Sequence, residues 1–429
     1  MIELDLIMVK VLNNKTIIEE VITRWVSTIY PSKDKLREAL FNTKKPMRIY
    51  IGVDPTGSDL HLGHLTNFLV MKRLQQLEHK VIFLVGDFTA MIGDPTNKSA
   101  IRKPLTREQV RKNMRTFKKQ ASLIISFSGD NPAEVRFNSE WYRSMSLDKF
   151  MGVVGYFTVR NMLNRDMFKE RSKNRSEEEW LDAVGLKELI YPLLQGYDGV
   201  EMDVDIELGG NDQIFNMSIG RALRKAYSEK GAVPQTKSGD KFFVATTLLI
   251  NPRTGEKLMN KSDGGMINLI DKPEDMFGKV MALNDEAMFQ VAELSSEMDL
   301  NEVKELKEGL EKREMNPRDV KFRIAEEVVR TIFGVKEAEK AKNNFDKVFS
   351  RHELPSNLPS LKLKNKKIAA ADLVFLSGVV KSKTQAWRLV EQGALSVEGK
   401  VKNNPKEILN LRGGESLKIG KKSFFRVVD

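Results

Sequence analysis

The stretch that decides the fold begins with a short apolar run, Arg48-Ile-Tyr-Ile-Gly-Val-Asp54, and continues into the turn Pro55-Thr-Gly-Ser-Asp59. A helical pattern then spans Leu62 to His79, and a second apolar run, Lys80-Val-Ile-Phe-Leu-Val-Gly86, follows it directly. Short apolar runs bounded by turn residues are typical of buried strands. The order strand, turn, helix, strand is the βαβ unit of a parallel, doubly wound sheet. The sequence therefore predicts an α/β fold.

Two regions of different character surround this unit. Residues 1–45 carry apolar side chains at helical spacing, for example from Ile17 to Ile29, and are predicted to form an N-terminal helical segment. Residues 46–283 are predicted to hold the whole sheet together with an inserted helical connective region. The further strand candidates in this region are 133–137, 203–208 and 246–250.

The second half of the chain changes pattern twice. Residues 284–350 show a helical pattern throughout and are strongly charged, so an all-helical region is predicted. Residues 351–360 contain two prolines and are predicted to be a linker. Residues 361–429 show two short helical stretches, near 369–376 and 384–392, and then a series of short strands. We therefore expect a small α+β module after the linker.

The charge of the chain is concentrated in this last module. Residues 361–429 contain fifteen Lys or Arg against six Asp or Glu, whereas the whole chain of 429 residues has a net charge of +11. A basic module on a nearly neutral body is typical of a part that meets a polyanion. The alternative is a solvated, lysine-rich surface with no partner.

The composition excludes several kinds of protein. The chain has 41% hydrophobic and 30% charged residues, as an ordinary globular protein does, and its length predicts two to four domains. It has no cysteine, which excludes disulfides, thiol catalysis and cysteine metal sites. No run approaches the roughly 18 apolar residues of a membrane-spanning helix, and the N-terminus lacks the pattern of a secretory signal. We expect a cytoplasmic protein with no membrane partner.

The first candidate site is the pair of histidines in His61-Leu-Gly-His64, where the turn after the first strand becomes a helix. The start of a helix presents unpaired N–H groups and a positive dipole end, which favour phosphate. Imidazoles placed there add hydrogen bonds, and Gly63 permits a close approach of a ligand. Two alternatives are a zinc pair, which lacks further ligands nearby, and a helix cap that happens to contain histidine.

Two further loops carry cations among glycines and polar residues. One is Gly255-Glu-Lys-Leu-Met-Asn-Lys-Ser-Asp-Gly-Gly265, where a lysine can move onto a polyphosphate. The other is Gly93-Asp-Pro-Thr-Asn-Lys-Ser99, followed by Arg102. Taken alone, each is also explained as a surface loop with incidental basic residues.

Together these motifs resemble a known family. His61–His64 and Leu258-Met-Asn-Lys-Ser262 are similar to the two signature motifs of the class I aminoacyl-tRNA synthetases. Further segments resemble the bacterial tyrosine-specific members of that family, in the same order along the chain. These segments are Tyr50–Thr56, Gly93–Pro95, Tyr191–Asp198 and Gly209–Gln213. The tail segment 381–400 is similar to an RNA-binding module first known from a ribosomal protein. The resemblance covers about residues 30 to 429.

The resemblance implies a fold and a reaction. The fold is α/β, a Rossmann-like doubly wound parallel sheet in the catalytic domain, then an all-helical domain that faces the anticodon, and a small α+β RNA-binding module. The reaction joins L-tyrosine to ATP, with Mg²⁺, to give tyrosyl-adenylate and pyrophosphate. The tyrosyl group is then transferred to the 3′ end of tRNA(Tyr). No tightly bound cofactor and no protein-bound metal are implied, and the family leads us to expect a homodimer.

The resemblance also assigns residues. The groups that act on the phosphates are His61, His64, Thr56, Lys98, Arg102 and Lys261. Those that bind ATP are Gly52, Asp54, Gly63, Gly210, Asp212, Lys261 and Ser262. Those that bind tyrosine are Tyr50 and Asp198 at the phenol, Asp94, Tyr191 and Gln195 at the ammonium group, and Gln213 at the carboxylate. Those that bind tRNA are Lys381, Lys383 and Arg388.

The chain departs from the family pattern at the lysine loop. Leu258 stands where the family usually has a lysine, and Asn260 replaces a small residue. Either Lys257 takes over the missing charge, or the leaving pyrophosphate has one cation fewer around it. The charged stretch 169–180 is interpreted as a surface insertion with no assigned role.

Two alternative functions remain open at the level of sequence. One is activation of tryptophan by an enzyme of the same fold, against which the pair Tyr50 and Asp198 and the basic tail argue. The other is a non-catalytic RNA-binding protein built on a synthetase scaffold. The departure at Leu258 favours that reading, whereas the presence of both histidines and of Lys261 opposes it.

Overall fold

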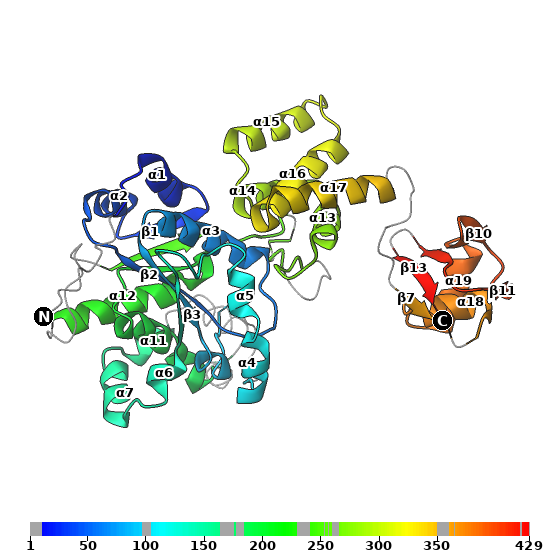
Figure 1. The fold of residues 1–429 in the computed structure, drawn as a ribbon. Helices are drawn as coiled ribbons and strands as arrows, with labels where there is room; N and C mark the ends of the chain where they lie inside the picture. The colour runs from blue at the N-terminus through cyan, green and yellow to red at the C-terminus, as the bar shows by residue number, and fades with distance from the viewer. Residues whose placement is uncertain are drawn as a thin grey trace, which may run out of the picture. The chain divides into compact units, whose positions relative to one another are not determined.

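The computed structural model describes residues 11–96, 104–163, 176, 184–229, 241–252, 254–255, 257–259, 266–349, 360–363, 365–420 and 423–428. The chain forms two compact units, Met1–Ala338 and Glu339–Asp429 (Figure 1). The predicted linker 351–360 lies outside the described residues except for its last residue. The predicted insertion 169–180 also lies outside them except for Ser176.

The first unit is built on a six-stranded sheet in the order β1-β6-β5-β2-β3-β4. Its strands are β1 (Val26–Tyr30), β2 (Arg48–Val53), β3 (Lys80–Val85), β4 (Glu134–Phe137), β5 (Ile206–Gly210) and β6 (Phe242–Thr246). All neighbouring pairs are parallel except β1 with β6. The chain builds outward from β2 through β3 to β4, and then returns to the other side of β2 with β5. The carboxyl ends of β2 and β5 therefore meet at a switch point of the topology, where sheets of this kind bind ligands.

Helices connect and cover these strands. They are α1 (Lys15–Thr23), α2 (Lys33–Asn42), α3 (Leu62–Gln76), α4 (Arg107–Met114), α5 (Phe117–Ala121), α6 (Ser139–Tyr142), α7 (Leu147–Val154), α8 (Val159–Leu163), α11 (Leu186–Glu201) and α12 (Ile214–Glu229), with short 3₁₀ turns η1 (Thr89–Met91) and η2 (Asn211–Gln213). Helix α3 contacts β3 and β5, and α12 contacts β5 and β6. The prediction of a doubly wound, Rossmann-like sheet is confirmed, with one antiparallel strand at its edge.

Two predictions of local structure were wrong. The N-terminal segment is not helical throughout, because α1 ends at Thr23 and β1 follows it. Strand β1 is rich in β-branched residues and pairs with β6, and its Tyr30 stacks on Phe243 with ring centres 5.3 Å apart. The strand predicted at 246–250 lies earlier in the chain, at Phe242–Thr246. All five residues of this strand are buried in the sheet.

A group of helices follows the sheet in the first unit (Figure 1). They are α13 (Pro273–Met281), α14 (Asp285–Leu294), α15 (Leu300–Glu311) and α16 (Pro317–Phe333), and α17 (Val335–Phe349) continues the chain. Helix α16 begins with Pro317 after the capping side chain of Asn316. It ends with Phe333, and the residue that follows, Gly334, has a φ of 85°. The helical character predicted for residues 284–350 is confirmed for the described residues.

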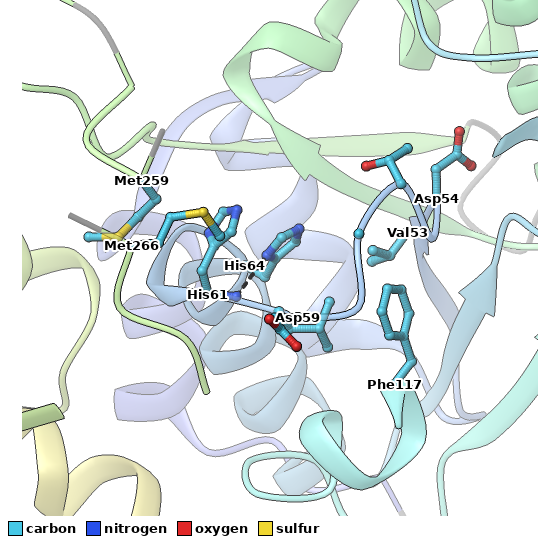
Figure 2. A pocket seen from close by; sticks show the side chains of 11 residues that line it. Val53, Asp54, Asp59, His61, His64, Phe117, Met259 and Met266 are labelled. Carbon is cyan, nitrogen blue, oxygen red and sulfur yellow. Dashed lines mark hydrogen bonds between the residues drawn. The ribbon is translucent and has the colours of Figure 1, made fainter. Parts of the chain in front are cut away.

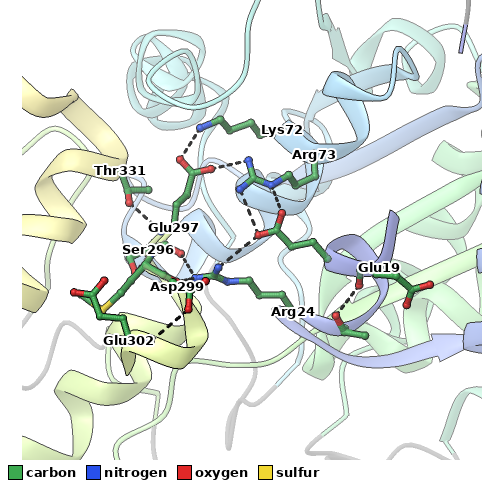
Figure 3. A network of polar contacts seen from close by, with 12 residues as sticks. Glu19, Arg24, Lys72, Arg73, Ser296, Glu297, Asp299, Glu302 and Thr331 are labelled. Carbon is green, nitrogen blue, oxygen red and sulfur yellow. Dashed lines mark hydrogen bonds and ion pairs between the residues drawn. The ribbon is translucent and has the colours of Figure 1, made fainter. Parts of the chain in front are cut away.

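An ionic network fixes these helices to the sheet region (Figure 3). Near the end of α3, Arg73 pairs with Glu20 of α1 at 2.6 Å and with Glu297, which follows α14, at 2.7 Å. Lys72 pairs with the other oxygen of Glu297 at 2.8 Å. Burial raises the pKa of Glu297, but the two neighbouring cations outweigh it and lower that pKa overall. The helix that begins at the histidine pair is therefore fixed at its far end to the helical group.

The second unit contains the predicted α+β module. Its elements are β7 (Ser360–Lys362), β8 (Lys367–Ala369), α18 (Ala370–Leu376), α19 (Lys383–Glu391), β9 (Leu395–Val397), β10 (Lys400–Lys402), β11 (Ile408–Asn410), β12 (Ser416–Ile419) and β13 (Ser423–Val428). One sheet has the order β10-β9-β12-β13-β7, and a second pairs β11 with β8. Leu373, Val390 and Leu417 belong to a core within this unit. Over the described part of the whole chain, no helix has the length and apolar character needed to cross a membrane.

Candidate active site

The histidine pair forms the start of α3. His61 is the capping residue, and its Nδ1 accepts a hydrogen bond from Gly63 N at 3.1 Å. His64 Nδ1 accepts from His61 N at 3.1 Å, and the two rings lie 4.0 Å apart between centres. Because Nδ1 of His64 is an acceptor, the proton of a neutral ring resides on Nε2. Burial, aided by His61 and Lys257, lowers the pKa of His64 well below its usual range. The ring is therefore neutral and offers one N–H donor.

A cavity of about 200 Å³ lies in front of this helix start (Figure 2). Its lining residues are Val53, Asp54, Thr56, Gly57, Asp59, Leu60, His61, His64, Phe117, Met259 and Met266. Helix starts favour anions, and the cavity opens at the carboxyl end of β2. Met259 and Met266 flank the segment 260–265, which contains Lys261 and Ser262. Both of those predicted residues lie outside the described part of the chain, as do Lys98 and Arg102.

The structure places Lys257 beside the nucleotide-binding candidates. Its Nζ lies 2.6 Å from Asp212 Oδ2, and Asp212 lies in η2, directly after β5. The positive charge of Lys257 also contributes to the low pKa of His64. Leu258 is held by its main chain, whose N–H donates to Leu249 O at 2.9 Å. Lys257 thus brings a cation to the region where Leu258 lacks one.

The glycines predicted to approach ATP differ in what surrounds them. A Cβ on Gly63 would lie 3.0 Å from the His61 ring, and one on Gly210 would lie 2.6 Å from Asp212 Oδ1. A side chain at either position would therefore disturb a candidate binding group. Gly52 has only ordinary contacts around the same position, the nearest at 3.7 Å.

Tyr50 and Asp198 lie in one buried cluster, but each has a different partner. Tyr50 Oη donates to Gln195 O at 3.3 Å. Asp198 accepts from Trp141 Nε1 at 3.0 Å and from Asn138 Nδ2 at 3.3 Å. Burial raises the pKa of Asp198 to about 8. Burial, together with the nearby carboxylates, also raises the pKa of Tyr50 well above its usual range, so its hydroxyl keeps its proton.

Sequence reasoning missed Trp141 and Asn138. They lie in α6 and directly before it, about sixty residues from Asp198 along the chain. No local motif signals this contact, because it is made by the packing of α6 against α11.

Asp54 connects the residues predicted to bind the nucleotide with those predicted to bind the amino acid. Its Oδ2 accepts from Tyr191 Oη at 3.0 Å, and its Oδ1 accepts from Thr89 Oγ1 at 2.7 Å. Asp54 was predicted at the nucleotide, and it does line the cavity before His61. Its hydrogen bond to Tyr191, a residue predicted at the amino acid, places it between the two predicted ligands.

The remaining residues predicted at the amino acid are connected through Asn216. Asp94 Oδ2 accepts from Gln213 Nε2 at 2.9 Å. The Nδ2 atom of Asn216 donates to Gln213 Oε1 at 2.9 Å and to Gln195 Oε1 at 2.8 Å. Asn216 was not predicted, although its position three residues after Gln213 on a helical pattern is a usable signal. All six residues predicted to bind tyrosine therefore meet near the carboxyl ends of β2 and β5.

The residues predicted to bind tRNA lie in the second unit. Lys381, Lys383 and Arg388 are exposed, in and just before α19. Lys383 makes an ion pair of 3.3 Å with Asp372, and both side chains are largely exposed. In water such a pair is weak and is readily exchanged for a phosphate.

The site of the first unit combines a cavity at the start of α3 with a cluster of hydrogen-bonded polar side chains at the switch point of the sheet. Residues 42–350 match the family described as tRNA synthetases class I (W and Y), and the chain belongs to that family.

Its relatives point to the tyrosine branch. The chain is 35% identical over 412 residues to the tyrosine--tRNA ligase of Moorella thermoacetica, covering 95% of this chain and 94% of that one. It is 38% identical over 405 residues to the tyrosine--tRNA ligase of Haemophilus ducreyi, covering 94% and 96%. A solved structure of the mitochondrial tyrosyl-tRNA synthetase of Aspergillus nidulans, C-terminally truncated, has the same fold. Its TM-score is 0.63 at 21% identity, and the match covers 78% of this chain and 95% of that one.

Proposed function

We propose that this chain activates L-tyrosine with ATP and transfers the tyrosyl group to the 3′ end of tRNA(Tyr). The observation that carries the proposal is the junction at Asp54. The buried side chains assigned to tyrosine, which include Tyr50 and Asp198, are linked through Tyr191 and this carboxylate to the cavity at the start of α3. An amino acid and a nucleotide bound there would lie side by side, as adenylate formation requires.

The first step joins the tyrosine carboxylate to the α-phosphate of ATP and releases pyrophosphate. The attacking group is already an anion, so no general base is required. Catalysis then rests on position and on stabilising the charge that spreads over the phosphates. His64 donates Nε2–H to a phosphate oxygen, and His61 and Thr56 contribute from the lining of the same cavity. Lys98, Arg102 and Lys261 are assigned to the leaving pyrophosphate by family resemblance alone.

Selection of tyrosine is assigned to Tyr50 and Asp198. The substrate phenol exchanges hydrogen bonds with these two buried groups. Phenylalanine would fill the same space and leave them without that partner, which costs about 1–3 kcal/mol for each buried polar group. Phenylalanine is therefore rejected because it cannot form the hydrogen bonds that these two buried groups make with a phenol.

The ammonium group of the substrate is assigned to Tyr191, Asp94 and Gln195, and its carboxylate to Gln213. An ammonium group has only donors, and these residues supply acceptor oxygens. Gly52, Gly63, Gly210 and Asp212 are assigned to the nucleotide, together with Ser262.

Mg²⁺ is proposed as an ion carried by the phosphates of ATP. Among the described residues no group of three acidic or histidine side chains is placed to hold a metal.

The proposed partners extend to a second copy of the chain. Leu147, Met151, Val159 and Leu186 are 74%, 56%, 66% and 72% exposed, in α7, α8 and the first residue of α11. Large apolar side chains with this much exposure favour burial against another surface. We assign them to a homodimer interface, in a protein that works in the cytoplasm, where tRNA serves translation.

The experiment for the proposed function is transfer of labelled tyrosine to tRNA by the full chain with ATP and Mg²⁺. We expect a base-labile tyrosyl ester, lost when periodate has destroyed the terminal ribose diol of the tRNA. Changing Lys381 and Lys383 together to Glu should raise KM for tRNA and leave tyrosine activation unchanged. Transfer of tryptophan and not tyrosine would overturn the assignment of Tyr50 and Asp198.

A further inference from the structure

A buried ion pair lies beneath the proposed tyrosine pocket. Lys241 Nζ is 2.6 Å from Glu207 Oε2, and the two side chains are 0% and 1% exposed. Glu207 lies in β5, directly beside Tyr50 of β2 in the register of the sheet. Lys241 precedes β6. Neither residue was predicted from the sequence, and neither has a role in the steps assigned above.

The fold reserves space for the Lys241 side chain. A Cβ on Gly199 of α11 would lie 2.5 Å from its Nζ, and a Cβ on Gly220 of α12 would lie 2.9 Å from it. Gly196 and Gly220 also bring the two helix backbones into close contact, since a Cβ on Gly196 would lie 2.9 Å from Gly220 Cα. Removing an ion pair from water costs about as much as the pair returns, so stability is a weak reason for it.

The pair reaches the pocket through Gln195. Glu207 Oε1 accepts a hydrogen bond from Gln195 Nε2 at 3.3 Å, and Gln195 Oε1 accepts from Asn216 Nδ2 at 2.8 Å. A carboxamide alone can turn over, because its two ends have similar shape. A carboxylate is an acceptor only, so Glu207 permits only the NH₂ end of Gln195 to face it. The other oxygen of the carboxylate is paired with Lys241 Nζ at 2.6 Å.

We propose that Glu207, neutralised by Lys241, is a positioning residue that holds the oxygen of Gln195 toward the ammonium group of the amino-acid substrate. The inference rests on the proposed function, which assigns that ammonium to Gln195. An ammonium group donates and never accepts, so the opposite orientation of the amide would repel it. Gln195 Oε1 has two lone pairs and, among the described residues, accepts one hydrogen bond, from Asn216, which leaves the other lone pair for the substrate.

The neighbouring glutamine, Gln213, has the same arrangement of hydrogen bonds. Gln213 Nε2 donates to the carboxylate of Asp94 at 2.9 Å, and its Oε1 accepts from Asn216 at 2.9 Å. Each glutamine thus has a carboxylate at its nitrogen end and Asn216 at its oxygen end. Two amides with fixed orientations meet at one side of the pocket.

The test is Glu207→Gln, which keeps the shape but supplies a group that can donate. Three ligands are compared by calorimetric binding to the full chain: tyrosine, tyramine, and 3-(4-hydroxyphenyl)propanoate, which lacks the ammonium group. We expect the affinity for tyrosine and tyramine to fall about tenfold, the loss of one hydrogen bond to a charged group. Glu207 also contacts the hydroxyl of Tyr50, so a small loss can be shared by all three ligands, and the affinity for the desamino analogue should fall much less than that for tyrosine and tyramine.

Two further variants keep the test decisive. Glu207→Gln combined with Lys241→Met leaves no unpaired charge, so it covers the case in which the single variant fails to fold, and it should show the same loss. Glu327→Gln is the matched control, because Glu327 is 2% exposed and pairs with Arg323 at 2.9 Å in α16. It should leave all three affinities unchanged.

The outcomes distinguish failure of the proposed function from failure of the positioning role. If the unchanged chain fails to prefer tyrosine over the desamino analogue, the proposed function itself is wrong. If it shows that preference and the Glu207 variants keep it in full, the positioning role is wrong. An equal loss for all three ligands would also overturn that role, because it would mean a general disturbance of the pocket.

Discussion

Replacing Lys257 with methionine removes the cation that, in our proposal, takes over from the lysine usually found at the position of Leu258. Lys257 Nζ lies 2.6 Å from Asp212 Oδ2, and its side chain is 48% exposed. A unit charge about 4 Å from a phosphate oxygen is worth about 4 kcal/mol at the effective dielectric of a protein surface. Exposure to solvent reduces this to the range of a charge-assisted hydrogen bond, about 1.5–3 kcal/mol. We therefore expect adenylate formation to slow by about 10- to 150-fold.

The assay is single-turnover formation of tyrosyl-adenylate by Lys257→Met, with the Kd for tyrosine measured separately. The rate should fall, and the Kd should remain unchanged, because Lys257 lies on the nucleotide side. Adding Leu258→Lys should restore part of the rate. Lys321→Met, which breaks an ion pair of 2.8 Å with Asp285, is the control and should have no effect on the rate. Adenylate formation at the unchanged rate in Lys257→Met would refute the reasoning.

Three further predictions concern specificity, acid stability and packing. Tyr50→Phe should lower the preference for tyrosine over phenylalanine in kcat/KM by about tenfold, through the loss of one buried hydrogen bond. Glu297→Gln should destabilise the protein by about 1–3 kcal/mol at neutral pH in urea unfolding, because Lys72 and Arg73 lose their charged partner. Since the native pKa of Glu297 is lowered, its contribution is present above pH 4.5 and is lost as the pH falls further, so the variant should differ less from the unchanged chain in acid. Gly220→Ala should cost about 1–3 kcal/mol by overpacking, and an unchanged urea midpoint would contradict the close approach of α11 and α12.

The strands of the sheet were predictable where the residues of the strand itself form a clear apolar pattern. The runs that became β2 and β3 are apolar after their first residue, and a helical pattern lies between them, so the βαβ unit follows from sequence alone. Strand β1 was missed because Val26 and Ile29 also fit the helical spacing that begins at Ile17. Its conformation depends on pairing with β6, about 220 residues away, which no local pattern reports.

The site residues were likewise predictable where a local motif contains them, and not where only long-range contacts bring them together. His61 and His64 were predictable because one short motif contains both, and the helix start explains their chemistry. Glu207 was missed, although a charged residue inside a buried strand is a signal of function or of a buried pair. Its partner Lys241 lies 34 residues away, just before β6, and the parallel pairing of β6 with β5 brings the two together.

The central claim is tested most directly by amino-acid-dependent exchange of labelled pyrophosphate into ATP, with tyrosine, phenylalanine and tryptophan compared on the folded full chain in the presence of Mg²⁺. Exchange with tyrosine alone is the result we predict, from the buried pair Tyr50 and Asp198 beside the histidine cavity. Exchange with tryptophan in place of tyrosine would keep the family and contradict the pocket. No exchange with any of the three would contradict catalysis itself and point to the missing lysine at Leu258.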